Sequence, residues 1–535
     1  MKTFILAYDI GTTGVKTCLF AVENTIELIA SASEGYGLYI MPDGGAEQDA
    51  DEWWNAMAHT TAAVFTKTDV KPDQVAGISF CSQMQGLVLV DKDGIPVRRP
   101  MSYMDQRSTA EIKKGIANGI QIAGANIFKL IPSLLITGAV SSSVKDPMWK
   151  CKWVEAHEPE NFARAYRWLD VKDYLAARCT GEFKMTEDSA FATLLYDTRP
   201  GRKCFSHKMC QMFGIREELL PPIIRSTDEV GRLTERAAEE LGLVPGIPVF
   251  GGGGDSSLIG VGAGCVRLGD THIYSGTSGW VITVTDKQTV DADAMIAAIT
   301  GAQDGKFNYF AEMETANKCL EWAKDHLALD ELGVFASPDG SATGKGYEGV
   351  YTNIYSYLTN AVRDVAPGSG GVIFTPWLHG NRCPFEDPYA TGMFFGIRLE
   401  TGKRELVHAV LEGIFYHLRW MLECEDRKVR TAERIRFVGG GALSPVSCQL
   451  LADILGRTVE TVENPQNVGS VGAAAVIGVG LGLIPSLESV CDFIPASAVY
   501  EPDPDRHARY QPYYESFKKL YKANKDLYKS LPEEA

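Results

Sequence analysis

Two segments in different halves of the 535-residue chain turn on nearly the same four residues. Residues 4–22 read FILAYDIGTTGVKTCLFAV, and residues 270–285 read DTHIYSGTSGWVITVT. In each segment, two apolar runs rich in β-branched and aromatic residues flank a turn of the form Gly-Thr-(Ser/Thr)-Gly, which is typical of a strand–turn–strand unit. Internal repeats should be considered before single motifs when a fold is inferred. This repetition predicts an α/β chain built from two related halves.

The residue types at the first turn suit a phosphate group. Glycines let the backbone come close to a ligand, and successive N–H groups form an anion-binding nest. Thr12, Thr13 and Lys16 add hydroxyls and a cation. Asp9 would repel a phosphate unless a divalent cation lay between them, so its position implies Mg²⁺, which binds few protein carboxylates. A plain hairpin turn explains one copy equally well, but two copies favour phosphate-holding hairpins that face each other across a cleft, as the β- and γ-phosphates of ATP require.

Other phosphate motifs fit less well. The chain contains no G-x-x-x-x-G-K-[ST] string. Residues 251–264, GGGGDSSLIGVGAG, have the glycines of a dinucleotide-binding turn, but Asp255 would repel a pyrophosphate. Asp255 suits a general base that takes a proton from a substrate hydroxyl as its oxygen attacks the γ-phosphoryl group. The structural alternative for Asp255 is a helix N-cap.

A second glycine-rich strand end lies at 438–445, VGGGALSP. Such a segment lets a flat ring such as adenine lie against the backbone. A tight turn followed by a helix that Ser444 caps is the alternative interpretation.

The composition and charge of the chain argue against several classes of partner and location. The net charge is −16, from 52 Lys and Arg against 68 Asp and Glu, which argues against nucleic-acid and anionic-membrane partners. The apolar stretch at 471–485 is short for a bilayer span and is expected to be a tightly packed core helix. Asp9 ends the N-terminal apolar run too early for a signal peptide. The 12 cysteines form no C-x-x-C pair, so we expect free thiols in a cytoplasmic protein.

A coarse assignment of elements places the main boundary near 250, where the strand PGIPVF meets four glycines. The expected domains are 1–250 and 251–535. A helix is predicted over 49–65, two helices over 152–181 with a break at Pro159, a hairpin around Asp93-Gly94, and a closing helix over 509–531.

Together these motifs resemble the FGGY carbohydrate kinases, and within that family the xylulokinases. The resemblance covers nearly the whole chain and keeps the order of the family's motifs, from DIGTTGVK through VFGGGGDSS and GTSG to VGGGALSP. The most specific match is GMFFGIRLETGKRELVHAVLEG at 392–413, which satisfies a spaced family signature at Gly396, Glu405, Ala409 and Glu412.

The resemblance implies an actin-like (ribonuclease-H-like) ATPase fold, in which two α/β domains enclose a deep central cleft for ATP and sugar. It assigns Asp255 as the general base and places Mg²⁺ near Asp9 and Asp255. The implied binding residues are Gly11, Thr12, Thr13, Lys16, Gly276, Thr277 and Ser278 for the phosphates, Gly440, Gly441 and Ala442 for the adenosine, and Met84, Gln85, Asp105, Arg107 and Asp255 for the sugar.

The sugar site departs from the family pattern, because Met84-Gln85 stands where xylulokinases commonly have Met-His. Gln can hydrogen-bond a hydroxyl, but it does not titrate. A small ketose such as xylulose is therefore the first expected substrate, and ribulose, glycerol, erythritol and gluconate stay open. An actin-like ATPase that phosphorylates no sugar and, more remotely, a dinucleotide-dependent oxidoreductase are the other classes.

Two further expectations concern assembly and a poorly matched segment. Family members are often homodimers, although the sequence itself shows no interface. Residues 325–370 match the family pattern less well, and we expect an insertion near the mouth of the cleft.

Overall fold

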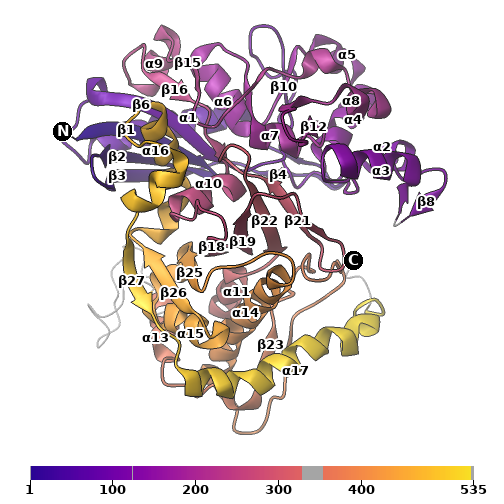
Figure 1. The fold of residues 1–535 in the computed structure, drawn as a ribbon, viewed down its shortest axis with the longest axis vertical. Helices are drawn as coiled ribbons and strands as arrows, with labels where there is room; N and C mark the ends of the chain where they lie inside the picture. The colour runs from indigo at the N-terminus through magenta and orange to yellow at the C-terminus, as the bar shows by residue number, and fades with distance from the viewer. Residues whose placement is uncertain (1, 123, 328–353, 532–535) are drawn as a thin grey trace.

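A computed structural model describes residues 2–122, 124–327 and 354–531 of the chain. The predicted insertion at 325–370 therefore lies largely outside the described residues. The chain forms two lobes, each built around a large mixed sheet (Figure 1). We call the lobe that contains β1 the first lobe and the lobe that contains β18 the second lobe.

The sheet of the first lobe has the order β15-β16-β6-β1-β2-β3, and β17 also pairs with β6. Its strands are β1 (Thr3–Ile10), β2 (Gly14–Val22), β3 (Ile26–Gly35), β6 (Val75–Ser82), β15 (Glu229–Arg232), β16 (Pro248–Phe250) and β17 (Gly253–Gly254). β1 and β2 are antiparallel, with Asp9 opposite Lys16, whereas β1 and β6 are parallel. The turn at 11–13 thus lies at the carboxyl end of a central strand.

The sheet of the second lobe repeats this arrangement. Its order is β20-β21-β22-β19-β18-β25-β26-β27, so an antiparallel hairpin again lies beside a parallel strand. The strands are β18 (Thr271–Ser275), β19 (Gly279–Thr285), β20 (Val290–Asp291), β21 (Ile296–Thr300), β22 (Phe307–Met313), β25 (Arg434–Val438), β26 (Thr458–Val462) and β27 (Ala496–Tyr500). The prediction of two related halves is confirmed.

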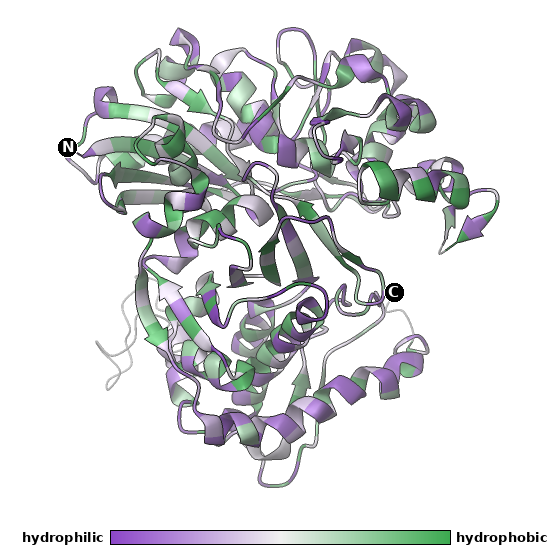
Figure 2. Cartoon of the chain, in the orientation of Figure 1, coloured by the Kyte–Doolittle hydropathy of each residue, from purple (hydrophilic) through white to green (hydrophobic). Residues whose placement is uncertain are grey.

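Helices cover both sheets. The expected helix at 49–65 is α1 (Ala50–Phe65), which Asp49 caps by accepting from the Asp51 N–H at 3.0 Å. Other helices are α10 (Asp255–Gly262), α11 (Asn317–Leu327), α14 (Lys403–Asp426), α15 (Pro445–Leu455), α16 (Val468–Gly480) and α17 (Pro504–Tyr528). Hydrophobic residues concentrate on the strands of both sheets, and hydrophilic residues prevail along α17 (Figure 2).

Further elements lie between these strands and helices. They are β4 (Tyr39–Ile40), β5 (Ala46–Glu47), β7 (Val88–Val90), α2 (Thr109–Gly115), β8 (Gln121–Ile122), β9 (Ala125–Asn126), α3 (Ile127–Ile136), β11 (Met185–Thr186), α7 (Glu187–Ala192), β12 (Tyr196–Asp197), β13 (Cys204–Phe205), α8 (His207–Phe213), β14 (Ile223–Ile224), α9 (Glu235–Leu241), α13 (Ile354–Ala361), β23 (Ile373–Thr375) and β24 (Met393–Phe395).

The prediction of two helices over 152–181 is wrong. This region holds α4 (Pro147–His157), α5 (Pro159–Arg164), β10 (Arg167–Leu169) and α6 (Val171–Thr180). Pro159 begins α5, where its missing N–H leaves no bond unmade. β10 interrupts the helical pattern because it pairs with β7. The expected hairpin around Asp93-Gly94 forms as a short one. The Asp91 N–H donates to the Ile95 carbonyl and the Val97 N–H to the Leu89 carbonyl, both at 2.9 Å, and Val90 and Pro96 form an antiparallel bridge.

The apolar stretch at 471–485 lies mostly in α16, which returns from late in the chain to pack on β1, β6 and α10 in the first lobe (Figure 1). Its residues Val468–Gly478 are all buried. Among the described residues, no helix is long and apolar enough to cross a membrane. The prediction of a packed core helix is confirmed.

Candidate functional site

The first Gly-Thr-Thr-Gly turn opens on a cavity of about 390 Å³ that Asp9, residues 11–16 and residues 33–35 line. The Gly11 N–H donates to the Gly14 carbonyl at 2.9 Å, which closes the turn. The Lys16 ammonium donates to the Gln466 carbonyl at 2.9 Å, just before α16. The predicted phosphate residues Gly11, Thr12, Thr13 and Lys16 therefore share one cavity.

Asp9 lies at the end of β1 against the first turn of α16. A Cβ at Gly469 would stand only 2.7 Å from Asp9 Oδ2, so only glycine leaves room for this carboxylate. Burial raises the pKa of Asp9, whereas the Lys16 ammonium and the Cys81 thiol oppose that rise. A buried carboxylate with raised proton affinity gains from a nearby cation.

The second turn and the adenosine motif are in direct contact. Gly439 has φ of 89°, and a Cβ there would stand 2.6 Å from the Ser275 carbonyl oxygen. A Cβ at Gly441 would stand 2.9 Å from the Ser275 Cβ. The structure thus brings Gly276, Thr277 and Ser278 together with Gly440, Gly441 and Ala442, because β18 and β25 are parallel neighbours.

Asn317, which the sequence did not single out, ties the second turn to the start of α11. Its amide donates to the Ser275 carbonyl at 2.8 Å and accepts from the Ser275 hydroxyl at 3.0 Å. Its N–H donates to the Gly276 carbonyl at 2.9 Å. A lone Asn after a strand carries no motif, so this role becomes visible only in the fold.

Tyr274 connects the second hairpin to the carboxylates of the first lobe. Its ring stacks on Trp280 at 4.0 Å between centroids, and its hydroxyl would stand 2.3 Å from a Cβ at Gly276. Burial raises the pKa of Tyr274, and the charges of Asp9 and Asp255 raise it further. Tyr274 of the second hairpin is thus within electrostatic range of both Asp9 and Asp255.

Asp255 is the first residue of α10, and Gly254 occupies the N-cap position instead. Asp255 Oδ1 accepts from the Ser256 N–H at 2.7 Å. Burial raises the pKa of Asp255 to about 7; the Ser256 N–H opposes this rise, and the charges of Glu312, Asp9 and Asp170 add to it. The proton affinity thus lies close to neutral pH, which suits a general base.

Asp9 and Asp255 together fit Mg²⁺. Both carboxylates are partly exposed, partial burial raises both pKa values, and the charge of Asp9 adds to the rise at Asp255. Their hard oxygen atoms are the donors that Mg²⁺ prefers. Within the described ranges, no group of three or more His, Cys, Asp and Glu side chains could hold a metal ion. A magnesium site here would therefore complete its shell with water and phosphate oxygens.

On the sugar side, Met84 packs directly on the segment that carries Asp255. Its Sδ accepts from the Ser256 hydroxyl at 3.1 Å and would stand 2.0 Å from a Cβ at Gly254. Gln85 follows in the left-handed region, with φ of 61°. Tyr103, which the sequence analysis missed, lies between this side and the phosphate turn, where its hydroxyl accepts from Thr12 at 3.5 Å.

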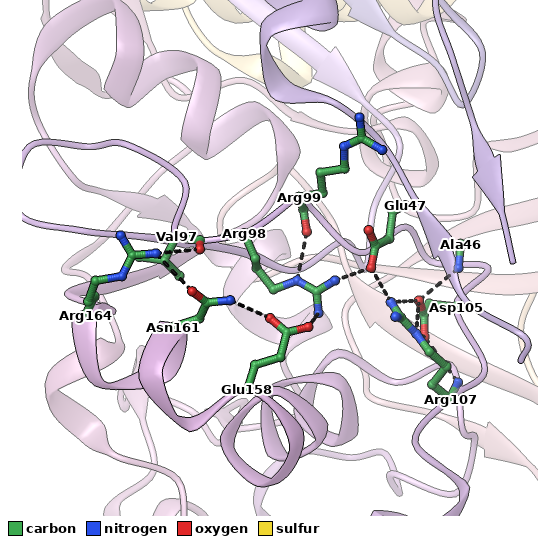
Figure 3. A network of polar contacts seen from close by, with 10 residues as sticks. All are labelled: Ala46, Glu47, Val97, Arg98, Arg99, Asp105, Arg107, Glu158, Asn161 and Arg164. Carbon is green, nitrogen blue, oxygen red and sulfur yellow. Dashed lines mark hydrogen bonds and ion pairs between the residues drawn. The ribbon is translucent and has the colours of Figure 1, made fainter.

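Asp105 and Arg107 lie in an internal ion-pair network (Figure 3). The Arg107 guanidinium donates to Asp105 Oδ2 at 2.6 Å and to Glu47 Oε1 at 2.7 Å. Asp105 also accepts from the Ala46 N–H at 2.9 Å and is 0% exposed. Arg98 pairs with Glu47 and reaches Glu158 at 3.0 Å. The direct contact of Asp105 and Arg107 with sugar stays a prediction.

The chain is similar to known proteins over nearly its whole length. The family models for the N-terminal and C-terminal domains of the FGGY family of carbohydrate kinases match residues 4–262 and 272–481. A xylulose kinase of Staphylococcus epidermidis is 29% identical over 528 residues, 98% of either chain. A gluconokinase of Bacillus subtilis is 27% identical over 518 residues, 96% of this chain and 94% of the relative.

Among solved structures, a ligand-bound xylulose kinase from Lactobacillus acidophilus superposes with a TM-score of 0.82 at 23% identity, over 98% of this chain and 99% of that one. This likeness confirms the predicted fold, a two-domain α/β architecture of the actin-like, ribonuclease-H-like ATPase type.

Proposed function

Because the chain belongs to the FGGY family of carbohydrate kinases, we propose that it transfers the γ-phosphoryl group of ATP to a hydroxyl of a small ketose, with xylulose as the first candidate. The observation that carries this proposal is the position of Asp255. Both of its chain neighbours, Gly254 and Ser256, lie against Met84 on the proposed sugar side, and its charge acts on Asp9 and Tyr274 on the phosphate side.

Each group has a defined task in this reaction. Asp255 takes the proton from the sugar hydroxyl as its oxygen attacks the γ-phosphorus. Thr12, Thr13 and Lys16 hold phosphate oxygens from one side, and Thr277 and Ser278 hold them from the other. The Gly440–Ala442 turn receives the adenosine, with residues 1–250 carrying the sugar and 251–535 the nucleotide. Asp9 and Asp255 would hold Mg²⁺, which when bound neutralises charge on the phosphates.

The raised pKa of Asp255 predicts an acid limb in the pH profile. Only the carboxylate form accepts a proton, so kcat/KM for the sugar rises with pH through about 7, the pKa of the buried group. A cation beside the carboxylate favours its charged form, so higher Mg²⁺ concentration moves the limb to lower pH. Profiles measured at two Mg²⁺ concentrations check both effects, and a limb that does not move would leave Mg²⁺ unconnected to Asp255.

A substrate panel tests the function itself. Purified protein is mixed with ATP and Mg²⁺, and ADP release is followed with xylulose, ribulose, glycerol, erythritol and gluconate in turn. We expect the highest kcat/KM on xylulose and no ADP release without an acceptor. Preferred turnover of another acceptor would replace xylulose as the substrate. ADP release at the same rate with and without an acceptor would instead favour an actin-like ATPase.

Gluconate is the second candidate, because a gluconokinase is among the relatives over nearly the full chain. A sugar acid needs a cation for its carboxylate. The Arg382 guanidinium lies on the second lobe, but it already pairs with Glu312. The buried Lys150 ammonium donates to the Gln85 carbonyl at 2.8 Å. Because both cations have partners of their own, we place the neutral ketose first.

A further inference from the structure

Four charged side chains are buried in the first lobe behind Gln85 and Asp255, and the proposed reaction uses none of them. Asp170, Lys172, Asp173 and Asp188 are 4%, 1%, 3% and 1% exposed. They come from the start of α6 and from α7. We call them the buried charge cluster. Burying charges is expensive unless each finds partners, so what these partners are indicates what the cluster does.

Asp170 holds the backbone of the turn that carries Gln85. Its Oδ2 accepts from the Gln85 N–H at 3.0 Å, and its Oδ1 accepts from the Gly86 N–H at 3.0 Å. On the other face of the same turn, the Lys150 ammonium donates to the Gln85 carbonyl at 2.8 Å. Both Asp170 and Lys150 are buried. They therefore hold the turn through its two N–H donors and through the Gln85 carbonyl.

These hydrogen bonds account for an unusual backbone conformation at Gln85. Gln85 has φ of 61°, a left-handed conformation that residues with a Cβ rarely adopt. Such strain persists only where the surroundings impose it. The direction of the Gln85 side chain follows from this φ, so Asp170 and Lys150 determine where its amide points.

Asp188 holds the segment that carries Asp255. Its Oδ2 accepts from the Gly254 N–H at 2.7 Å, and Gly254 is the N-cap directly before Asp255. Its other oxygen accepts from the Ser189 N–H at 2.9 Å and from the Thr186 hydroxyl. The peptide that leads into the base is therefore fixed by a carboxylate from a different element.

Lys172 joins these carboxylates into one unit. Its ammonium donates to Asp173 Oδ1 at 2.7 Å and lies 3.9 Å from Asp188 Oδ1. Burial lowers the pKa of Lys172, but the charges of Asp173, Asp188 and Asp170 outweigh this effect and raise it. One cation thus compensates carboxylates that hold two backbone segments almost 170 residues apart in the sequence (Gln85 and Gly254).

We propose that the buried charge cluster positions both sides of the reaction, with Asp170 setting the orientation of Gln85 toward the sugar and Asp188 setting the position of the base Asp255. The inference rests on the proposed function, since it takes Gln85 as a sugar contact and Asp255 as the base. Asp170 and Asp188 are positioning residues that act through the backbone of others.

Asp170→Asn and Asp188→Asn test this assignment because they give different kinetic signatures. An amide keeps the shape but has one acceptor oxygen and loses the charge that strengthens hydrogen bonds to N–H groups. We expect Asp170→Asn to raise the sugar KM about tenfold with little change in kcat or in the KM for ATP. We expect Asp188→Asn to lower kcat about tenfold with little change in the sugar KM.

Asp197→Asn is the matched control. Asp197 is 4% exposed in the same lobe and pairs with Arg199, away from both held segments. A purely structural loss should lower the melting temperature and the active fraction of all three variants alike, and it should leave every KM unchanged. If Asp170→Asn and Asp188→Asn behave like this control, the positioning role is overturned.

Gln85→Gly supplies an independent readout, since glycine adopts the left-handed turn without strain. If Asp170 acts through Gln85, Asp170→Asn should raise the sugar KM much less in the Gln85→Gly background than alone. Equal increases in both backgrounds would contradict the proposal. If Asp170→Asn does not fold, Lys150→Met, which releases the other face of the turn, should show the same rise in sugar KM. Unchanged sugar KM in that variant would also contradict it.

The substrate panel separates this inference from the proposed function. An unchanged protein that phosphorylates no acceptor on the panel would overturn the proposed function. An active protein whose Asp170 and Asp188 variants show no split between KM and kcat would overturn the positioning role alone.

Discussion

Asp255→Asn is expected to fold, to bind ATP and to lose about 10³-fold in kcat, within the range that a general base contributes. The asparagine keeps a carbonyl oxygen for the Ser256 N–H, which Asp255 Oδ1 accepts at 2.7 Å. It has no site that takes a proton near neutral pH. The Asp255 carboxylate also repels Asp9, so its replacement removes a repulsion and should not unfold the protein.

The measurement is steady-state turnover together with ATP binding and thermal unfolding of the same preparation. Asp49→Asn is the control, since Asp49 caps α1, has no assigned role in the reaction, and Asn caps a helix about as well. That control should keep turnover and stability. Near-normal turnover in Asp255→Asn would show that another group accepts the proton and that the assignment of the base is wrong.

Local sequence patterns were sufficient for the parts of the fold that depend on nearest neighbours. The alternation around 11–14 and 276–279 predicts two hairpins, and both form as β1–β2 and β18–β19. The glycine-rich ends at 251–254 and 438–441 also lie at strand ends, the first in β17 beside β6 and the second at the end of β25 beside β18. Such signals are readable because a turn and its flanking strands are contiguous in the chain.

Long-range contacts account for what the sequence did not predict. The turn at Gln85 depends on Lys150 and Asp170, which lie 65 and 85 residues further along the chain. No local pattern encodes these partners. Tyr103 and Asn317 gain their places in the same way, through contacts with Thr12 and Ser275.

The prediction for residues 152–181 is wrong for a related reason. Its spacing is helical on both sides of Pro159, yet Arg167–Leu169 forms β10 because β7 offers an edge. Tertiary pairing overrides local propensity for short segments. Asp105 and Arg107 form a polar pattern at a strand end. The pattern does not tell whether these side chains face a cleft or an internal partner, because that partner, Glu47, precedes them by about 60 residues.

The contact between α10 and α16 leads to the second large expected effect. The two helices touch through their backbones. A Cβ at Gly472 would stand 2.2 Å from the Leu258 carbonyl oxygen, and a Cβ at Gly262 would stand 1.9 Å from the Val468 carbonyl oxygen. Backbone atoms do not swing aside as a flexible side chain does, so any added methyl group must push the helices apart.

Gly472→Ala should therefore lower the free energy of unfolding by about 3 kcal/mol, at the upper end of the usual cost of overpacking a core. Activity should fall with it, because α10 begins at Asp255 and α16 begins against Asp9 through Gly469. Denaturant unfolding and turnover measure the two effects.

Gly402→Ala makes the same chemical change where the nearest atom is the flexible end of Glu405, at 3.0 Å and with φ of −104°. This control should lose no more than about 1 kcal/mol, because Gly402 is the N-cap of α14, where alanine is less favourable than glycine, and no backbone atom lies in the way of its methyl group. Equal stability of the two variants would mean that the α10–α16 contact yields easily. In that case it would not be what holds Asp9 and Asp255 in a fixed relation, and the buried charge cluster would have to hold the base segment without help from α16.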